Sequence, residues 1–467
     1  MLAQTPAKGC EIVADMNAKA RSRHFPMGGQ RDKDCREEEK GEWERMKRRY
    51  VLVMVALCGL TMVSLGLVLK LAGLFFTPVA DEFGCGRGEA SLALTVVNLA
   101  SALAGLAAAR LVRRMRLRVL VAAGAACTVG GTALLSLAQG LPMLYLLSAV
   151  QGFGAGLIGS VLVTDVVGEW FVRRRALAVS VAFGSSGIAG AVFSPLVSRV
   201  IQGVGWRAGY LASALIMLVL CLPALLAPVA RTPGELGLAP YGAAAREKRA
   251  ACGTPDGSVG ESVTSVDVDA DEGADKSADK EAAPSASARL AAVLYFAFAT
   301  TMVTAVPHHF PGMAGAYGLA ASVGALMISV CMVVNTCGKF ALGWAIGRFG
   351  LRTAAVADVA MVAGGLALLA AVRTAPGVYV AAALVGCAYS AVTVLLSTLV
   401  RALYGDEGYG RVFPKANLAS TLGTAVGAPF IGFVFDLTGG YAKALIVLAV
   451  LVLAGLVTVL RLPRRAD

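Results

Sequence analysis

The sequence is poor in charged residues, which make up 15% of its 467 residues, against roughly 25% in a soluble domain. Hydrophobic residues make up 57% and the mean hydropathy is +0.70. So few charges cannot cover a soluble fold of this length, which excludes an ordinary soluble enzyme. The net charge of +12 does not favour nucleic acid as a partner, because the basic residues flank apolar runs and therefore indicate membrane topology.

The sequence also lacks the residue patterns of metal and nucleophilic chemistry. Its ten cysteines form no CxxC pair, and its three histidines have no metal-ligand spacing. No HExxH motif and no nucleophile–base pair is present. We therefore expect no metal site, no cofactor and no enzymatic activity.

What the sequence does have is a series of long apolar runs. A span of about 20 apolar residues crosses the roughly 30 Å hydrocarbon core of a bilayer. Twelve runs approach or exceed that length, at 50–80, 90–109, 119–138, 141–167, 176–198, 208–230, 290–307, 317–344, 353–372, 378–400, 412–434 and 444–460. This pattern predicts an all-α integral membrane protein whose twelve transmembrane helices form two six-helix pseudo-repeats.

Two polar segments divide the chain. Residues 1–49 are mixed in charge and contain no apolar stretch of a signal peptide, so we expect a disordered cytoplasmic tail, with a start at a later Met such as Met46 as an alternative. Residues 231–289 are acidic and rich in small side chains, which predicts a disordered cytoplasmic linker. The six-helix bundles are then expected at 50–230 and 290–461.

The distribution of Lys and Arg predicts the orientation in the membrane. With the N-terminus inside, the inner short loops and tails hold 19 Lys and Arg residues, and the outer loops hold 5. Because cytoplasmic loops carry an excess of basic residues, both termini and the linker are expected on the cytoplasmic side of the plasma membrane.

The two halves resemble each other at one constant offset, which we call the repeat offset. The turn from Arg114 to Arg118 corresponds at this offset to the turn from Arg348 to Arg352. Gly152 and Gly386 are separated by the same offset, as are Pro195 and Pro429. Two six-helix repeats with a substrate site between them form a transporter architecture.

Several stretches resemble the major facilitator superfamily, and within it the group of monocarboxylate porters and oxalate/formate antiporters. The turn GWAIGRFGLR resembles the superfamily's loop between helices 8 and 9, although Gly347 replaces its aspartate. The stretch GEWFVRRRALAV is similar to the porters' signature between helices 4 and 5, and GWRAGYL and RTPGELGLAPYG resemble two further segments of the group. The resemblance implies a secondary transporter that moves a small organic anion, a mono- or dicarboxylate, through the lipid bilayer by alternating access.

Four residues are candidates for binding that anion. Ionisable residues inside a membrane span are costly and by default functional. Lys70 lies within the first span, and by resemblance matches a cavity lysine of the porters. Lys339 stands where the resemblance implies a carboxylate-binding arginine, and Asn335, one turn earlier, stands where it implies an aspartate that pairs with that arginine. Lys415 matches a lysine of the oxalate exchangers, but it lies only four residues beyond Arg411.

Each of these assignments has a structural alternative. Lys70 and Lys415 could extend along the helix to the membrane surface, and Lys339 could be an ordinary cytoplasmic-end lysine. Asp165 and Asp358 are expected to be structural partners of cytoplasmic arginines. His308 and His309 are expected to form an interfacial pair at the outer end of a helix, with a pH-sensitive gate as the alternative.

The sequence leaves the function open in three respects. Coupling to protons and exchange for a second anion both remain open, because Asn335 removes a protonatable partner. A drug or other solute efflux protein of the same superfamily is the nearest alternative, although three lysines argue against its apolar cavity. A membrane sensor or scaffold that no longer transports is the alternative from another class.

Overall fold

The computed structural model describes residues 48–171, 175–226, 230–238, 240–241 and 286–461. Apart from residues 48–51 at the start of the first span, the elements described below belong to one compact unit, Leu52–Asp467. Most of the tail and linker predicted at 1–49 and 231–289 lie outside the described residues. The described regular structure is helical, with one isolated bridge between Phe171 and Tyr241.

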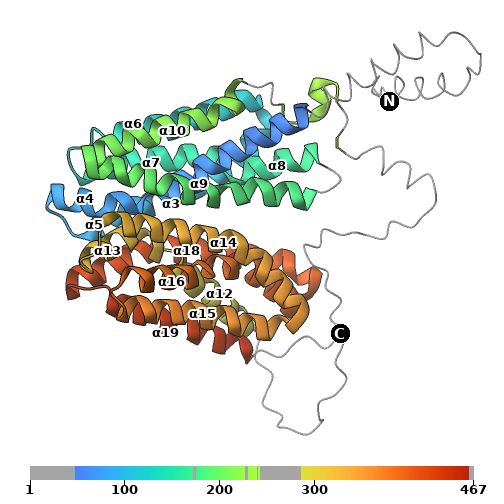
Figure 1. Cartoon of the computed structure of the whole chain (residues 1–467). Coiled ribbons are helices and arrows are strands. Elements are labelled where there is room, and N and C mark those ends of the chain that lie inside the picture. The colour runs from blue at the N-terminus through green and yellow to red at the C-terminus, as the bar shows by residue number, and fades with distance from the viewer. Residues whose placement is uncertain (1–47, 172–174, 227–229, 239, 242–285, 462–467) are drawn as a thin grey trace, which may run out of the picture. The chain divides into compact units, whose positions relative to one another are not determined.

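The first bundle begins with the apolar span Arg48–Lys70, which ends in the π-helix η1 and the short helix α3. Its other helices follow in chain order (Figure 1). The bounds are η1 Met62–Leu67, α3 Val68–Lys70, α4 Gly73–Phe83, α5 Arg87–Arg114, α6 Leu117–Leu135, α7 Leu141–Leu157, α8 Ser160–Trp170, α9 Arg175–Val204, α10 Trp206–Leu226 and the short η2 Pro233–Leu236.

The second bundle repeats this order. Its bounds are α12 Ala286–Val303, η3 Val306–His309, α13 Phe310–Ala316, α14 Ala321–Phe349, α15 Leu351–Ala371, α16 Ala375–Gly386, α17 Ala388–Ser390, η4 Ala391–Leu395, α18 Leu396–Thr438 and α19 Ala442–Leu460. Gly405 breaks α18 into two spans, with a φ of 68° that favours glycine. Among the described residues, eleven helices are long and apolar enough to cross a membrane, and Ala375–Ser390 supplies a shorter twelfth. The predicted fold of twelve helices is confirmed.

Four of the spans are interrupted near their middle. The first breaks at Leu71–Ala72, after the π-helix η1 and the three residues of α3, and the fourth breaks at 158–159. The seventh is interrupted by the 3-10 helix η3, and the tenth by the π-helix η4. Broken helices leave backbone groups free at the depth where transporters bind their substrates, so these four interruptions indicate where to look for a site.

The sequence repeat is present in the packing as well. A Cβ placed on Gly152 would collide with the carbonyl oxygen of Val97, and one on Gly386 would lie 2.7 Å from that of Cys331. Cys331 follows Val97 by the repeat offset, so α7 packs on α5 as α16 packs on α14. The two halves therefore share one packing pattern.

The halves meet through two helix pairs, α5 with α18 and α9 with α14. The Thr95 hydroxyl donates to the carbonyl of Ala425, and Ser329 donates to that of Ala191 at 2.7 Å. Ser329 and Ala425 follow Thr95 and Ala191 by the repeat offset, so the two hydrogen bonds are equivalent. They join the halves symmetrically.

We call the end that contains connections 84–86, 317–320 and 439–441 the outer end, after the charge-based prediction, and the end that contains 115–116, 350 and 405 the inner end. Toward the inner end α9 and α14 separate. A Cβ on Gly187 would meet Thr336 at 2.6 Å, whereas one on Gly184 would meet nothing within 4 Å. Phe340, about three turns beyond Ser329 on the same face, is 71% exposed.

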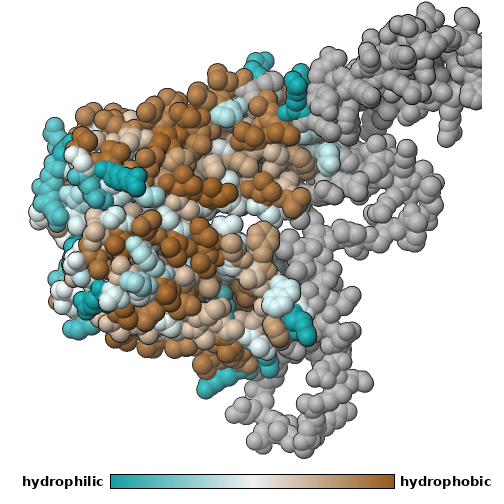
Figure 2. Space-filling view, viewed as in Figure 1, coloured by the Kyte–Doolittle hydropathy of each residue, from teal (hydrophilic) through white to brown (hydrophobic). Residues whose placement is uncertain are grey.

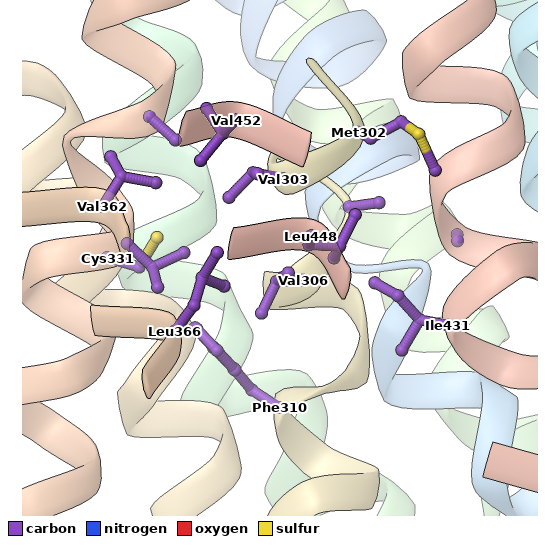
Figure 3. Close-up of a cluster of buried hydrophobic side chains, with 14 of the residues drawn as sticks. Met302, Val303, Val306, Phe310, Cys331, Val362, Leu366, Ile431, Leu448 and Val452 are labelled. Atoms are coloured by element: carbon purple, nitrogen blue, oxygen red, sulfur yellow. The ribbon is translucent and has the colours of Figure 1, made fainter. Parts of the chain in front are cut away.

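Apolar side chains cover the sides of both bundles, and hydrophilic residues gather at the end near α4 and α5 (Figure 2). Such a distribution is expected of a multi-pass membrane protein. Inside the second bundle a continuous apolar cluster includes Val303, Val306, Val362, Leu366 and Leu448 (Figure 3).

Candidate functional site

Lys70 lies at the first interruption and extends across to the other half. Its Nζ lies 3.8 Å from the centre of the Tyr389 ring, which belongs to α17 in the second bundle. A Cβ placed on Gly190 of α9 would lie 3.3 Å from Lys70 Cβ, so α9 closes over the stem of this side chain. The side chain is half-buried, and its ammonium group reaches the tyrosine of α17.

Tyr389 connects three of the interrupted spans, and the sequence analysis missed it. Its ring contacts Lys70 of the first span, and its hydroxyl donates at 2.8 Å to the carbonyl of Thr304, where the seventh span breaks. A cation over an aromatic face gains roughly 0.5–2 kcal/mol, more when desolvated. An aromatic residue next to an interrupted helix was the available signal, but a single tyrosine among apolar residues is not distinctive.

Asn335 lies on α14 where this helix packs against α9. It is 5% exposed, and its Oδ1 has no hydrogen-bond partner among the described residues. A Cβ on Gly187 would lie 3.9 Å from Asn335 Nδ2, which places the amide at the contact between the halves. A buried acceptor without a donor is costly, so this amide oxygen is available to a ligand.

Lys339 continues the same stripe of α14 toward the inner end. Ser329, Met332, Thr336 and Lys339 recur every three or four residues, and the first three contact α9 or face its glycines. Lys339 is half-buried and lies one turn from Asn335. It interacts electrostatically with Lys70, so two ammonium groups share this region.

Lys415 is exposed and makes no contact with the other three residues in the part of the chain that the structure describes. It lies on the inner half of α18, two turns before Leu422, which is 51% exposed. Further along this helix, Ala425 and Gly432 contact α5. Lys415 therefore lies toward the inner end, away from the group that contains Lys70, Asn335 and Lys339.

The acidic residues of the spans lie elsewhere. Asp165 accepts a hydrogen bond of 2.8 Å from Arg231 Nε, which confirms its predicted role as a structural partner of an arginine. This bond raises the pKa of Arg231, which lies outside the spans. Asp358 is 2% exposed and has no ion pair among the described residues, so the same prediction was wrong for Asp358.

His308 and His309 are buried, at 5% and 2% exposed, which corrects the expectation of an interfacial pair. His309 Nε2 lies 2.9 Å from the carbonyl oxygen of Ala428, and its ring packs against Phe76 and Tyr441. A Cβ on Gly73 would collide with the carbonyl oxygen of His308. The histidines therefore belong to the contact that closes the outer end, because the chain folds back between the halves at η3.

A second contact closes the outer end at the start of α5. The Asp436 carboxylate of α18 accepts hydrogen bonds from the backbone N–H groups of Arg87 at 3.0 Å and of Gly88 at 2.8 Å. The Arg87 guanidinium donates to the Tyr441 hydroxyl at 2.6 Å. Carboxylates are favourable at helix N-termini, so α18 provides a cap for a helix of the other half.

A cavity of about 40 Å³ lies inside the first bundle and away from the lysines. Gln151, Thr132 and Ser148 supply part of its polar lining, and Gln151 donates to Thr132 at 2.7 Å. This volume accommodates a few water molecules and no organic ligand. Gln151 therefore joins two helices of the first bundle and does not line a passage between the halves.

The arrangement at the centre is suited to a small anion. Lys70 and Tyr389 lie where broken helices meet, while Lys339 and the unpaired amide oxygen of Asn335 lie one turn apart on α14. No acidic side chain contacts these residues in the part of the chain that the structure describes. A negative charge placed there is attracted by both ammonium groups. The lining comes from both halves, so a ligand would contact both.

Comparison with known proteins agrees with the fold. The sequence profile of the Major Facilitator Superfamily matches residues 52–256. The chain is 25% identical over 417 residues to monocarboxylate transporter 11 of Mus musculus, which covers 85% of this chain and 84% of that protein. It is 27% identical over 164 residues to the oxalate:formate antiporter of Oxalobacter formigenes, which covers 35% of this chain. That alignment spans only 38% of the antiporter.

A solved structure shares the fold. The D-xylose–proton symporter superposes with a TM-score of 0.63 at 13% identity, over 88% of this chain and 97% of that chain. At this identity the likeness concerns the fold alone. The profile match over residues 52–256, the similar sequences and the twelve-helix fold show that the chain resembles the major facilitator superfamily, and within it the monocarboxylate transporters and the oxalate:formate antiporter.

Proposed function

We propose that this protein is a secondary active transporter that moves a small organic anion, a mono- or dicarboxylate, across the plasma membrane by alternating access. The observations that carry the proposal are the Lys70 ammonium on the Tyr389 ring and the unpaired amide oxygen of Asn335, which lies one turn from Lys339 on α14. The names of the similar proteins, monocarboxylate transporters and an oxalate:formate antiporter, support the same class of substrate.

The two lysines have complementary roles in this proposal. Lys70 leaves the Tyr389 ring to pair with the carboxylate, and Lys339 approaches it from α14. A carboxylate about 4 Å from an ammonium gains on the order of 4 kcal/mol at an effective dielectric of 20, before desolvation costs. Half of that gain already exceeds a tenfold change in affinity, since a factor of ten corresponds to about 1.4 kcal/mol. Asn335 orients the substrate, and Lys415 attracts anions at the inner end.

Alternating access follows from the contacts between the halves. Contacts at Asp436, Gly73 and Thr95 close the outer end, while α9 and α14 separate at Gly184. Rocking the halves about the central site would exchange which end is closed. Protons or a counter-anion would supply the driving force.

The test is uptake in proteoliposomes that contain the purified protein. A panel of radiolabelled small carboxylates is offered with and without a pH gradient, and with and without anion inside. Uptake stimulated by an acidic exterior indicates proton symport, and uptake stimulated by internal anion indicates exchange. Uptake of a neutral solute with no response to any carboxylate would refute the proposal.

The residue assignment is tested with Lys339. Lys339→Ala should reduce anion affinity more than tenfold without loss of folded protein, while Lys339→Arg should retain transport, because guanidinium binds carboxylates with two hydrogen bonds. Lys443→Gln is the matched control, since Lys443 is exposed at the outer start of α19. An alanine variant that transports like the parent would show that Lys339 has no role in binding.

A further inference from the structure

Asp358 is a buried acid for which the proposed anion site has no use. It lies on α15, is 2% exposed, and its Oδ2 has no hydrogen-bond partner among the described residues. Val362 and Leu366, one and two turns further on, belong to the apolar cluster of the second bundle (Figure 3). A charged carboxylate is costly at such a position, because burial removes its hydration and no counter-charge compensates the loss among the described residues.

The packing shows which part of the molecule Asp358 faces. A Cβ on Gly365, two turns further along α15, would lie 3.0 Å from the backbone nitrogen of Val385 on α16. The two helices run in opposite directions, so Asp358 lies two turns closer to the inner end, beside α17 and η4. The carboxyl group also interacts electrostatically with the thiol of Cys387, at the end of α16.

The first half gives the same answer independently. The residue equivalent to Asp358 is Gly124, and a Cβ there would lie 2.5 Å from Ile158 and 3.2 Å from both Gly154 and Leu157. Adding the repeat offset to these three contacts gives Val392, Ala388 and Ala391. The carboxyl group of Asp358 is thus placed against the segment where α17 ends and the π-helix η4 begins.

No counter-charge accompanies this carboxyl group among the described residues. The helices and turns packed on α15 are α14, α16, α17, η4 and α19. Apart from the Cys387 thiol, the ionisable side chains on these elements are Cys331, Cys337, Lys339, Arg348, Tyr379, Tyr389 and Lys443, and α15 itself carries Arg352. None of them forms a hydrogen bond or ion pair with Asp358 in the described part of the chain.

We propose that Asp358 is a proton-binding site of the second bundle, and that it holds its proton as the neutral acid in the conformation seen here. The step is the addition of one proton to one carboxylate oxygen, with no other bond made or broken. The proton comes from water at the inner end, since Asp358 lies seven residues, about 10 Å, from the start of α15 at Leu351. Neutralisation removes the cost of a buried charge.

The place of this site suggests what its proton controls. Tyr389 belongs to α17, the same short segment that Asp358 faces, and its ring holds Lys70. Ionisation of Asp358 would require water or a donor beside the α17–η4 segment, and so a shift of the segment that carries Tyr389. This coupling of proton to anion rests on the proposed function, whereas the proton site itself does not.

The proton site is tested by infrared spectroscopy of the full-length protein in lipid nanodiscs. At neutral pH the parent should show a protonated-carboxyl stretching band, which Asp358→Asn removes and Asp358→Glu shifts in frequency. Asp165→Asn is the matched control, because Asp165 is ion-paired with Arg231 and should contribute no such band. The absence of the band from the parent, or its persistence in Asp358→Asn, would overturn the proposal. The spectrum of the parent can be measured without any variant.

The coupling is tested with carboxylate uptake in proteoliposomes. Asp358→Asn should lower the rate of uptake driven by an imposed pH gradient at least tenfold. Exchange of labelled for unlabelled anion across the membrane should continue. The coupling would be overturned if both activities fell equally, or if neither fell. If the parent transports no carboxylate, the proposed function fails, and the infrared measurement still decides whether Asp358 binds a proton.

Discussion

The two six-helix halves have the same packing but different ionisable side chains. Gly152 on Val97 and Gly386 on Cys331 are equivalent contacts, and so are the hydrogen bonds of Thr95 and Ser329. In contrast, the positions equivalent to Lys70, Lys339 and Asp358 are Thr304, Gly105 and Gly124. The comparison teaches that a repeated fold carries chemistry that belongs to one copy only, so a charge that does not recur is a better functional candidate than a residue that does.

The largest effect is expected at the recurring glycines. Gly152→Val and Gly386→Val each place side-chain atoms against a backbone carbonyl that cannot move, and overpacking of this kind commonly costs about 1–3 kcal/mol or more. Both variants should lose most of the folded protein, measured as monodisperse yield and melting temperature. Gly130→Val and Gly364→Val are controls related by the same offset, because a Cβ meets nothing within 4 Å at either position. Similar losses of folded protein in the control variants would show that packing at Gly152 and Gly386 is not the cause.

At a position that does not recur, binding should change and stability should not. Lys70→Gln removes the cation held by Tyr389, so the KM for anions should rise about tenfold or more while melting temperature and membrane abundance stay within error of the parent. Transport kinetics and thermal unfolding of the same preparation check both parts. An unchanged KM for anions would show that Lys70 has a structural role and does not bind substrate.

The related hydrogen bonds should have equal and smaller effects. Thr95→Ala and Ser329→Ala each remove one donor between the halves, worth about 0.5–1.5 kcal/mol. Each variant should shift the population toward states that are open at the outer end by a similar factor. Spin-label distances across the outer end measure this shift. A shift from only one of the variants would show that the repeat does not extend to the energetics of the interface.

The smallest effect is expected at the outer surface, where Glu82 accepts hydrogen bonds from the Arg207 guanidinium and the Trp206 indole. These bonds lower the pKa of Glu82. A lowered pKa in the folded state means that the stabilisation is present above the ordinary value of about 4.3 and is lost as the pH falls through the folded-state value. Glu82→Gln should therefore lower the melting temperature slightly at neutral pH and not at strongly acidic pH. An equal effect at both pH values would exclude the ion pair as its cause.

The fold was largely predictable because a bilayer imposes a simple requirement. A helix that crosses it needs about 20 apolar residues, so composition alone indicates the spans near Tyr50, Leu141 and Ala442. The interruption of the tenth span was not predictable, because no proline lies at the π-helix η4. Hydropathy reports how long an apolar run is and not how its hydrogen bonds are arranged.

The sequence by itself determined the twelve spans, the repeat and the lysines that lie within the spans. Only the tertiary structure decided which of those charges meet: it places Lys70 on Tyr389, leaves Lys415 apart, and buries Asp358 without the arginine partner that its position in the sequence suggested. The physical reason is that burial and distance depend on helix rotation and on contacts between the halves. A turn of one residue, about 100°, moves a side chain from the lipid to the interior while the composition of the helix stays the same.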